Sequence, residues 1–214
     1  MEQKRISKAV IGRLPRYYRY LDELRKESVE RISSKELSEK MQLTASQIRQ
    51  DLNHFGGFGQ QGYGYNVEFL YNEIGKILGL DKKHNMILIG VGNIGRAMAG
   101  FLVPDMSGFH LAGLFDTDPN LIGTETAGLT IRSMDTIPEF AAENQVDMAV
   151  LAVPSTAAVE VAELVVRSGI KTIWNFALID LNLIMPKDVV VENVHIFDSL
   201  LRLSYSDNLH KTKA

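Results

Sequence analysis

A short apolar run that leads directly into a glycine motif constrains the fold of this chain more than any other feature. Residues 86–89 read MILI, residues 90–95 read GVGNIG, and apolar residues at helical spacing follow at once. In this context Gly90 permits a tight turn out of a strand, Gly92 lets the backbone approach a pyrophosphate, and Gly95 permits close helix–strand packing. The first N–H groups of the helix, with the positive end of its dipole, then face the phosphates.

The pattern after this motif predicts its surroundings. Strands are expected over 86–90, 111–115, 148–153, 171–175 and 189–192, with helices near 94–103, 136–143 and 156–168. Such alternation is typical of an α/β fold, in which helices cover both faces of a parallel sheet. We therefore predict a Rossmann-like dinucleotide-binding domain over residues 81–194.

An acidic residue at the end of the next strand narrows the prediction of which dinucleotide binds. Asp116 follows the strand that comes after the motif, 21 positions beyond Gly95. A carboxylate there accepts hydrogen bonds from a ribose 2′-OH and repels a 2′-phosphate. The sequence therefore favours NAD over NADP.

The ends of two later strands complete the predicted site, because ligands of doubly wound sheets lie outside the carboxyl ends of the strands. Two alternatives remain open: that Ser155 or Thr156 serves only as a helix cap, and that Asn175 serves only as a turn former. The expected cofactor-binding residues are Gly90, Gly92, Asn93, Ile94, Gly95, Asp116, Thr117, Val153, Pro154, Thr156, Asn175, Phe176 and Ala177.

The first 80 residues have a different character. Helices are expected over 15–27, 34–41, 45–55 and 67–79, and the middle two are joined by about three residues, as in a helix-turn-helix. Leu37, Met41, Leu43, Ile48 and Leu52 would form their shared core. Five glycines among residues 56–64, interleaved with aromatic residues, suit a tight β-ribbon or wing. Residues 1–80 are therefore predicted to be a winged-helix domain.

The charge distribution fits a polyanion facing this domain. Residues 1–80 carry 13 basic and 10 acidic side chains, a balance of +3, whereas residues 81–214 carry 10 and 16, a balance of −6. Side chains on the second helix of the pair can read base edges, although the same pattern also fits an ordinary solvated helix face. The expected DNA-binding residues are Arg13, Arg16, Lys35, Thr44, Ser46, Gln47, Arg49, Gln50, Gln60 and Tyr63.

Composition excludes several other classes. The chain has no cysteine, and its five histidines show no H-x-H or H-x-x-x-H spacing, so we expect no metal site. No apolar run approaches the ~20 residues that span a bilayer, and the N-terminus lacks the apolar core of a signal peptide. We expect a cytoplasmic protein that has no membrane segment.

Motifs spread over nearly the whole chain resemble the Rex family of bacterial redox-sensing transcriptional repressors. They are SSKELSEKMQLTASQIRQDLNHFGGFGQQGYGYNV, ILIGVGNIGRAM, LFDTDPNLIG, AVPSTAA and WNFA. The resemblance implies a repressor that is not an enzyme and acts as a homodimer on palindromic operator DNA. It also implies NADH and NAD⁺ as competing ligands, with NADH releasing the DNA, and a helix near 196–207, within residues 195–214, that swaps onto the partner subunit.

Two positions depart from the family pattern. Residues 59–62 read GQQG where the family commonly has G-K-R-G, so phosphate affinity and its salt dependence should be smaller. His195 stands where the family often has an Asp at the start of the swapped helix, in a polar network with an N-terminal Arg. Arg13 or Arg16 would be the candidates for that Arg.

Two other functions remain open at this point. One is an NAD-dependent oxidoreductase with an N-terminal dimerisation module, which would need a general acid/base such as His110 or His195. The other is a regulator whose ligand is a different adenosine compound, such as coenzyme A. For the repressor, a full switch from 1:99 to 99:1 requires about 5.5 kcal/mol of differential ligand affinity.

Overall fold

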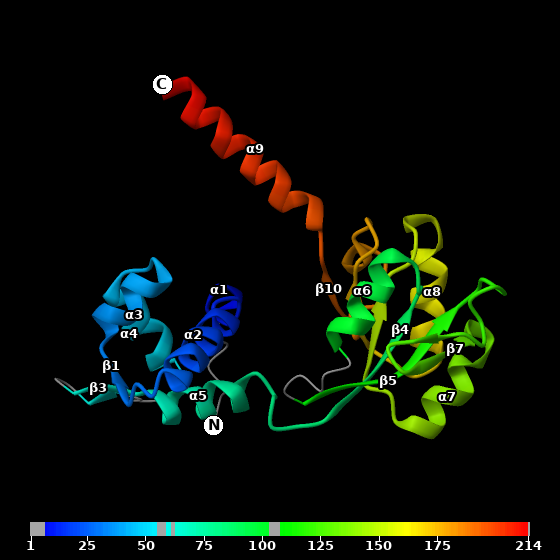
Figure 1. Cartoon of the computed structure of the whole chain (residues 1–214), viewed down its shortest axis with the longest axis horizontal. Helices are drawn as coiled ribbons and strands as arrows, with labels where there is room; N and C mark the ends of the chain where they lie inside the picture. The colour runs from blue at the N-terminus through cyan, green and yellow to red at the C-terminus, as the bar shows by residue number, and fades with distance from the viewer. Residues whose placement is uncertain (1–6, 55–58, 61–62, 103–107, 214) are drawn as a thin grey trace. The chain divides into compact units, whose positions relative to one another are not determined.

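The computed structural model describes residues 7–54, 59–60, 63–102 and 108–213. The chain divides into two compact units, Met1–Lys82 and Lys83–Ala214, and each is described by itself (Figure 1).

The first unit is mainly helical. A capping box starts the third helix, because Ser33 Oγ accepts a hydrogen bond from the Glu36 N–H and the Glu36 carboxylate accepts one from the Ser33 N–H. Thr44 Oγ1 caps the fourth helix in the same way, by accepting from the Gln47 N–H. The helices are α1 (Lys8–Ile11), α2 (Leu14–Lys26), α3 (Ser34–Met41), α4 (Ala45–Asn53) and α5 (Val67–Ile77).

The predicted helix-turn-helix and wing are both present. Four of the five expected core residues are buried, and Leu43 packs against the same cluster. The wing is an antiparallel sheet of order β1-β3-β2, formed by β1 (Arg31–Ile32), β2 (Gly59–Gln60) and β3 (Gly64–Asn66). The sequence pattern does not predict α1 and β1, because four and two residues are too few to show a periodicity. Residues 55–58 and 61–62 of the glycine-rich stretch, and with them the end of the predicted 45–55 helix, lie outside the described residues.

The second unit holds the predicted parallel sheet. Its strand order is β10-β9-β8-β4-β5-β7-β6, and every pairing is parallel except that of β6 with β7. The chain starts at the central β4, moves outward to one side and then returns to β8, as in Rossmann folds. The strands are β4 (His84–Ile89), β5 (Phe109–Asp116), β6 (Glu125–Thr126), β7 (Leu129–Ser133), β8 (Met148–Leu151), β9 (Thr172–Asn175) and β10 (Val190–Asn193).

Alternating side chains of the strands build a core on each face of this sheet. Ile87 and Ile89 pack with α7 (Ile137–Asn144) and α8 (Ser155–Arg167), whereas Met86 and Leu88 pack with α6 (Asn93–Leu102). The predicted helices are therefore confirmed within two residues. The sequence reading omitted β6 and β7, two short strands joined by a turn in which Ala127 and Gly128 have positive φ. It also omitted the short 3₁₀ helices η1 (Met134–Thr136) and η2 (Leu181–Leu183).

The last helix, α9 (Ile196–Lys213), runs beyond the predicted end at residue 207 because no glycine or proline interrupts it. All of its side chains from residue 196 to residue 211 are exposed. Its exposed large apolar residues are Ile196, Phe197, Leu200, Leu201, Leu203, Tyr205 and Leu209.

Candidate nucleotide site and nucleic-acid interface

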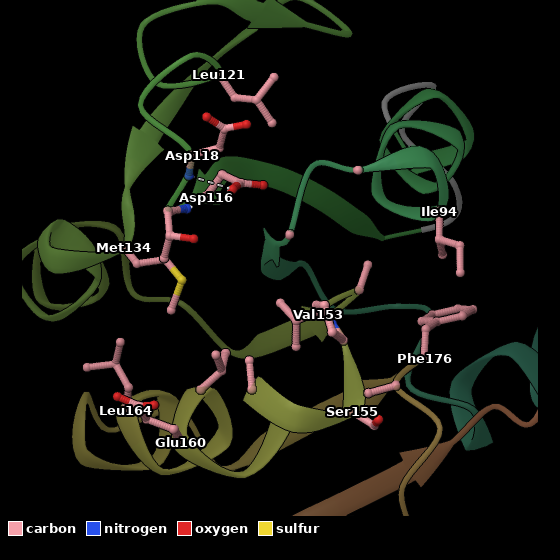
Figure 2. A pocket seen from close by; sticks show the side chains of 18 of the residues that line it. Ile94, Asp116, Asp118, Leu121, Met134, Val153, Ser155, Glu160, Leu164 and Phe176 are labelled. Carbon is pink, nitrogen blue, oxygen red and sulfur yellow. Dashed lines mark hydrogen bonds between the residues drawn. The ribbon is translucent and has the colours of Figure 1, made fainter.

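A cavity of about 880 Å³ lies at the carboxyl ends of the central strands, within the size range of small-molecule sites. Figure 2 shows Asp116 and Asp118 at one end, Ile94 and Phe176 at the other, and Val153 between them. Ten of the thirteen predicted cofactor residues line this cavity. They are Gly90, Gly92, Asn93, Ile94, Asp116, Thr117, Val153, Pro154, Phe176 and Ala177.

Each glycine of the motif has a distinct geometric role. Gly90 has a φ of +89°, and a Cβ there would lie 2.6 Å from the Ala152 carbonyl oxygen. A Cβ on Gly95 would lie 1.8 Å from the Gly90 carbonyl oxygen, so only glycine lets α6 approach the turn. By contrast, a Cβ on Gly92 would meet nothing within 4 Å, which leaves open space beside the backbone. This cradle fits the pyrophosphate of a dinucleotide.

Asp116 also anchors the glycine turn. Its Oδ2 accepts a hydrogen bond from the Val91 N–H at 2.6 Å, and its Oδ1 accepts from the N–H groups of Thr117 at 2.7 Å and Asp118 at 2.9 Å. The carboxylate therefore holds the turn after β4 against the end of β5. Arg96 supports the same turn, because its Nε donates to the Val91 carbonyl oxygen at 3.1 Å.

The two ends of the cavity differ in chemistry. Asp118 accompanies Asp116 at one end, on the same side as the apolar side chains of Leu121 and Met134. At the other end Phe176 is almost buried and makes an edge contact with Trp174, with ring centroids 4.8 Å apart. An acidic end for a ribose and an apolar end for a ring are therefore present in one cavity.

The sequence reading missed a stripe of α8 that lines the cavity. Ala157, Glu160, Val161 and Leu164 recur at positions i, i+3, i+4 and i+7 and so share one helix face. That periodicity was visible in the sequence, but only the tertiary structure shows that this face meets the cavity. The other lining residues absent from the prediction are Asp118, Leu121, Met134, Asp135, Ala152, Ser155 and Leu178.

Three predicted residues do not line the cavity. Gly95 is buried beneath the turn, Thr156 is exposed in the first turn of α8, and Asn175 is fully buried with its side chain hydrogen-bonded internally. Pro154 occupies the N-cap position of α8, so neither Ser155 nor Thr156 does so. The lining residues include no histidine, and His110 and His195 therefore lie outside this cavity.

The helix-turn-helix presents a polar surface. Arg49 Nη1, in the middle of α4, donates to Ser34 Oγ at the start of α3, at 3.1 Å, which ties the two helices together. Tyr63, next to the wing, is 70% exposed. Gln60 belongs to β2, but its side chain lies outside the described part. The other expected DNA-binding residues with exposed side chains are Arg16, Lys35, Thr44, Ser46 and Gln50.

Three of the expected DNA-binding residues, Arg13, Arg16 and Gln47, donate hydrogen bonds within the domain. Arg13 Nε and Nη2 donate to the fully buried Asp51 carboxylate, at 2.6 and 2.7 Å. Gln47 Nε2 donates to the same carboxylate at 2.8 Å, and the Tyr17 hydroxyl donates to it at 3.0 Å. Arg16 Nη2 donates to the Met41 carbonyl oxygen at the end of α3, at 2.7 Å.

This cluster shifts the pKa of the Asp51 carboxyl and of the Tyr17 hydroxyl. Burial alone raises the pKa of the Asp51 carboxyl, but hydrogen bonds from Arg13, Gln47 and Tyr17 outweigh burial and leave it below its ordinary value of 3.8. Burial, together with the Asp51 charge, raises the pKa of the Tyr17 hydroxyl. At neutral pH the cluster therefore contains an ionised carboxylate and a neutral phenol.

The described part of the chain contains no group of three or more acidic, histidine or cysteine side chains that could hold a metal ion. None of its helices is long and apolar enough to cross a membrane.

Two family models match the chain, one on each unit. Residues 5–53 match the model described as "Putative DNA-binding protein N-terminus", and residues 81–179 match the model described as "CoA binding domain".

Curated relatives match over nearly their whole length. The redox-sensing transcriptional repressor Rex of Thermoanaerobacter pseudethanolicus is 55% identical over 97% of this chain and 92% of its own length. Rex of Clostridium novyi is 54% identical, covering 96% of this chain and 97% of its own, and Rex of Clostridium perfringens strain SM101 is 51% identical over the full length of both.

Solved structures of a Rex-family repressor also match the chain over nearly its whole length. A Rex-family repressor named RSP, crystallised with β-NAD⁺ and operator DNA, matches with a TM-score of 0.90 and 55% identity over 97% of this chain and 94% of its own. RSP crystallised with β-NADH matches with a TM-score of 0.88 and 50% identity, covering 99% of this chain and all of its own.

A winged helix-turn-helix joined to a Rossmann-like domain with a dinucleotide cradle defines a transcription regulator of the nucleotide-sensing class. The chain belongs to the Rex family of redox-sensing transcriptional repressors. The family resemblance of the motifs is thereby confirmed. The relatives are named as repressors, so they give no support to the oxidoreductase alternative.

Proposed function

We propose that this chain binds NAD⁺ and NADH in the cavity of its second unit, binds operator DNA through α4 and the wing, and releases DNA when NADH is bound. The observation that carries the proposal is the glycine cradle, open at Gly92 and anchored by Asp116. RSP, at 50–55% identity, was crystallised with β-NAD⁺ and operator DNA and with β-NADH.

The chemistry of the cavity suggests how the protein discriminates between NAD⁺ and NADH. The nicotinamide ring is positively charged in NAD⁺ and neutral in NADH. Phe176 and Ile94 provide apolar surface at one end of the cavity, where a neutral group is accommodated at lower desolvation cost than a charged one. A ligand shifts a conformational equilibrium only through such a difference in affinity.

We also infer that the protein is a homodimer in which α9 packs on the partner subunit. Its apolar side chains are 45–64% exposed at five leucine and isoleucine positions, which is unusual for an unpartnered helix. Two winged-helix domains would then read a palindromic operator whose half-sites lie about 34 Å, one helical turn, apart or a multiple of that.

The proposed domain limits are those of the sequence reading: residues 1–80 for DNA, 81–194 for the nucleotide and 195–214 for the swapped helix and tail. The proposed DNA-facing residues are Lys35, Thr44, Ser46, Arg49, Gln50, Gln60 and Tyr63, with Arg13, Arg16 and Gln47 holding the helices that present them. A cytoplasmic location follows from the proposed access to DNA.

Fluorescence anisotropy with the operator duplex crystallised with RSP tests the proposal. NADH should weaken operator binding much more than NAD⁺ does when both are saturating. Equal effects of the two nucleotides would remove the redox-sensing claim for this chain. A series of salt concentrations in the same assay would measure the number of phosphate contacts made.

A further inference from the structure

A pair of hydrogen-bonded asparagine side chains, one buried and one partly buried, joins the cavity to the start of α9. Asn175 ends β9 and Asn193 ends β10, and the two residues are register partners in the sheet. The Asn175 Nδ2 donates to Asn193 Oδ1 at 2.9 Å, and Asn175 is fully buried. A buried polar side chain costs free energy unless it is hydrogen-bonded, so this pair holds a defined geometry.

The cavity side of the pair is the segment that begins with Phe176. Asn175 Oδ1 accepts from the Ala177 N–H at 3.0 Å, and its Nδ2 donates to the Ile179 carbonyl oxygen at 2.8 Å. Phe176, Ala177 and Leu178 all line the cavity. The Asn175 side chain thus sets the path of the backbone that forms the apolar end of the site.

On the side of α9, the pair is linked to Val194, the residue that follows Asn193. The Val194 N–H donates to the Asn175 carbonyl oxygen at 2.8 Å, and the Val194 side chain packs in the same apolar cluster as Phe176. Asn193 Nδ2 donates to Asp180 Oδ1 at 2.8 Å, which closes the segment from 176 to 180 onto the end of β10. A displacement at Phe176 therefore has two physical routes to the first residue of α9, only two positions beyond Val194.

We propose that Asn193 is a positioning residue that transmits the redox state of the nucleotide to α9, by locking the 176–180 segment to the end of β10. The inference rests on the proposed function, because it concerns how nucleotide binding and DNA binding are coupled. Coupling of this kind requires an element that both sites bias. Here the element is the hydrogen-bonded pair and the two short segments that it joins.

The test is a coupling ratio, the operator affinity with saturating NAD⁺ divided by that with saturating NADH. Asn193→Ala removes the bonds to Asn175 and Asp180, and it should lower this ratio at least about fivefold, the small end of typical allosteric couplings. Its affinity for NADH and its nucleotide-free affinity for the RSP operator duplex should stay within about threefold of the unmodified protein, because Asn193 does not line the cavity.

Asp180→Ala provides a second variant at an exposed position, in case Asn193→Ala folds poorly. It removes the bonds that Asp180 accepts from Asn193 and from the Asn182 N–H but leaves the Asn175–Asn193 bond in place. It should therefore lower the ratio less than Asn193→Ala, whereas Asp180→Asn keeps an acceptor oxygen and should restore the ratio. Asn182→Ala is the matched control, since only the backbone N–H of Asn182 contacts Asp180. Its ratio should equal that of the unmodified protein.

A direct readout is the exchange of the Val194 amide hydrogen, which should differ between the NADH and NAD⁺ complexes in the unmodified protein and not in Asn193→Ala. Unchanged coupling ratios in Asn193→Ala and Asp180→Ala would overturn the inference. Loss of nucleotide affinity with an intact ratio would overturn it as well, because that result describes a purely structural pair. Failure of the proposed function itself would be recognised separately, as equal effects of the two nucleotides on the unmodified protein.

Discussion

The guanidinium of Arg13 forms a bidentate ion pair with the carboxylate of Asp51, with N–O distances of 2.6 and 2.7 Å. The pair joins the start of α2 to the last turn of α4, the helix proposed to enter the major groove. An arginine that sequence reasoning places on DNA is therefore engaged inside the domain. A substitution of Arg13 should therefore affect the stability and orientation of α4 before it affects any contact with DNA.

Removing one partner of this pair should lower the free energy of unfolding substantially. Asp51→Ala leaves Arg13 and the Tyr17 hydroxyl without their shared acceptor, and we expect a loss of about 3–5 kcal/mol in the free energy of unfolding. Urea titration followed by circular dichroism measures it. Asp22→Ala, which breaks partly exposed pairs with Arg25 and Lys26 on α2, should cost less than about 1 kcal/mol. Equal losses in the two variants would contradict this assignment.

The pH dependence of stability follows from the same carboxylate. The pKa of Asp51 in the folded protein lies below its ordinary value of 3.8, so the unfolded chain takes up the proton first as the pH falls. The stabilisation is complete above that ordinary value and is lost as the pH falls through the folded-state pKa. Asp51→Asn, which cannot ionise, should lose less stability between pH 6 and pH 3. Parallel pH profiles would exclude Asp51 as a contributor.

Substitutions at different glycines of the motif should affect nucleotide binding and folding separately. Gly92→Ala places its methyl group in open space, so the thermal midpoint should stay near that of the unmodified protein while NADH affinity falls at least about tenfold. Gly95→Ala drives its methyl group against the Gly90 carbonyl and should destabilise the domain by more than about 2 kcal/mol. Gly100→Ala, exposed on α6, is the control and should stabilise by about 0.5–1 kcal/mol. Calorimetry and thermal melts distinguish the three variants.

Asp116 should control both affinity and the choice between NADH and NADPH. Asp116→Ala removes the acceptor for the Val91 N–H and a negative charge from the cavity, so NADH affinity should fall about tenfold or more. NADPH affinity should fall less, or rise, because the repulsion of its 2′-phosphate is reduced. Asp147→Ala is the control, since that carboxylate also accepts a backbone N–H, from Asn85, but lies outside the cavity. An unchanged NADH/NADPH ratio in Asp116→Ala would refute the role.

Two glutamines on α4 should behave differently. Gln50 is exposed, and Gln50→Ala should weaken operator binding by about 1–3 kcal/mol if it contacts an adenine, with little change in thermal stability. Gln47 donates to Asp51, and Gln47→Ala should lower stability by about 1–3 kcal/mol. Anisotropy titrations and thermal melts on both variants measure this contrast. A stability loss confined to Gln50→Ala would reverse the assignment.

Local patterns were sufficient to predict most elements of this protein. The capping signals at Ser33 and Thr44, and the apolar run before Gly90, depend on residues a few positions apart, and the structure places α3, α4 and β4 accordingly. The short strands β6 and β7 were missed because two to five residues show no decisive periodicity.

The sequence by itself determined the order of the two domains, the glycine turn and the acidic residue after β5, because each depends on spacing along the chain. Only the tertiary structure decided which polar side chains are free to meet a ligand. It directs Arg13 and Gln47 to Asp51, buries Asn175 against Asn193, and turns one face of α8 into a wall of the cavity. The physical reason is that a buried polar group requires a partner, and partners distant in sequence are selected only when the chain packs.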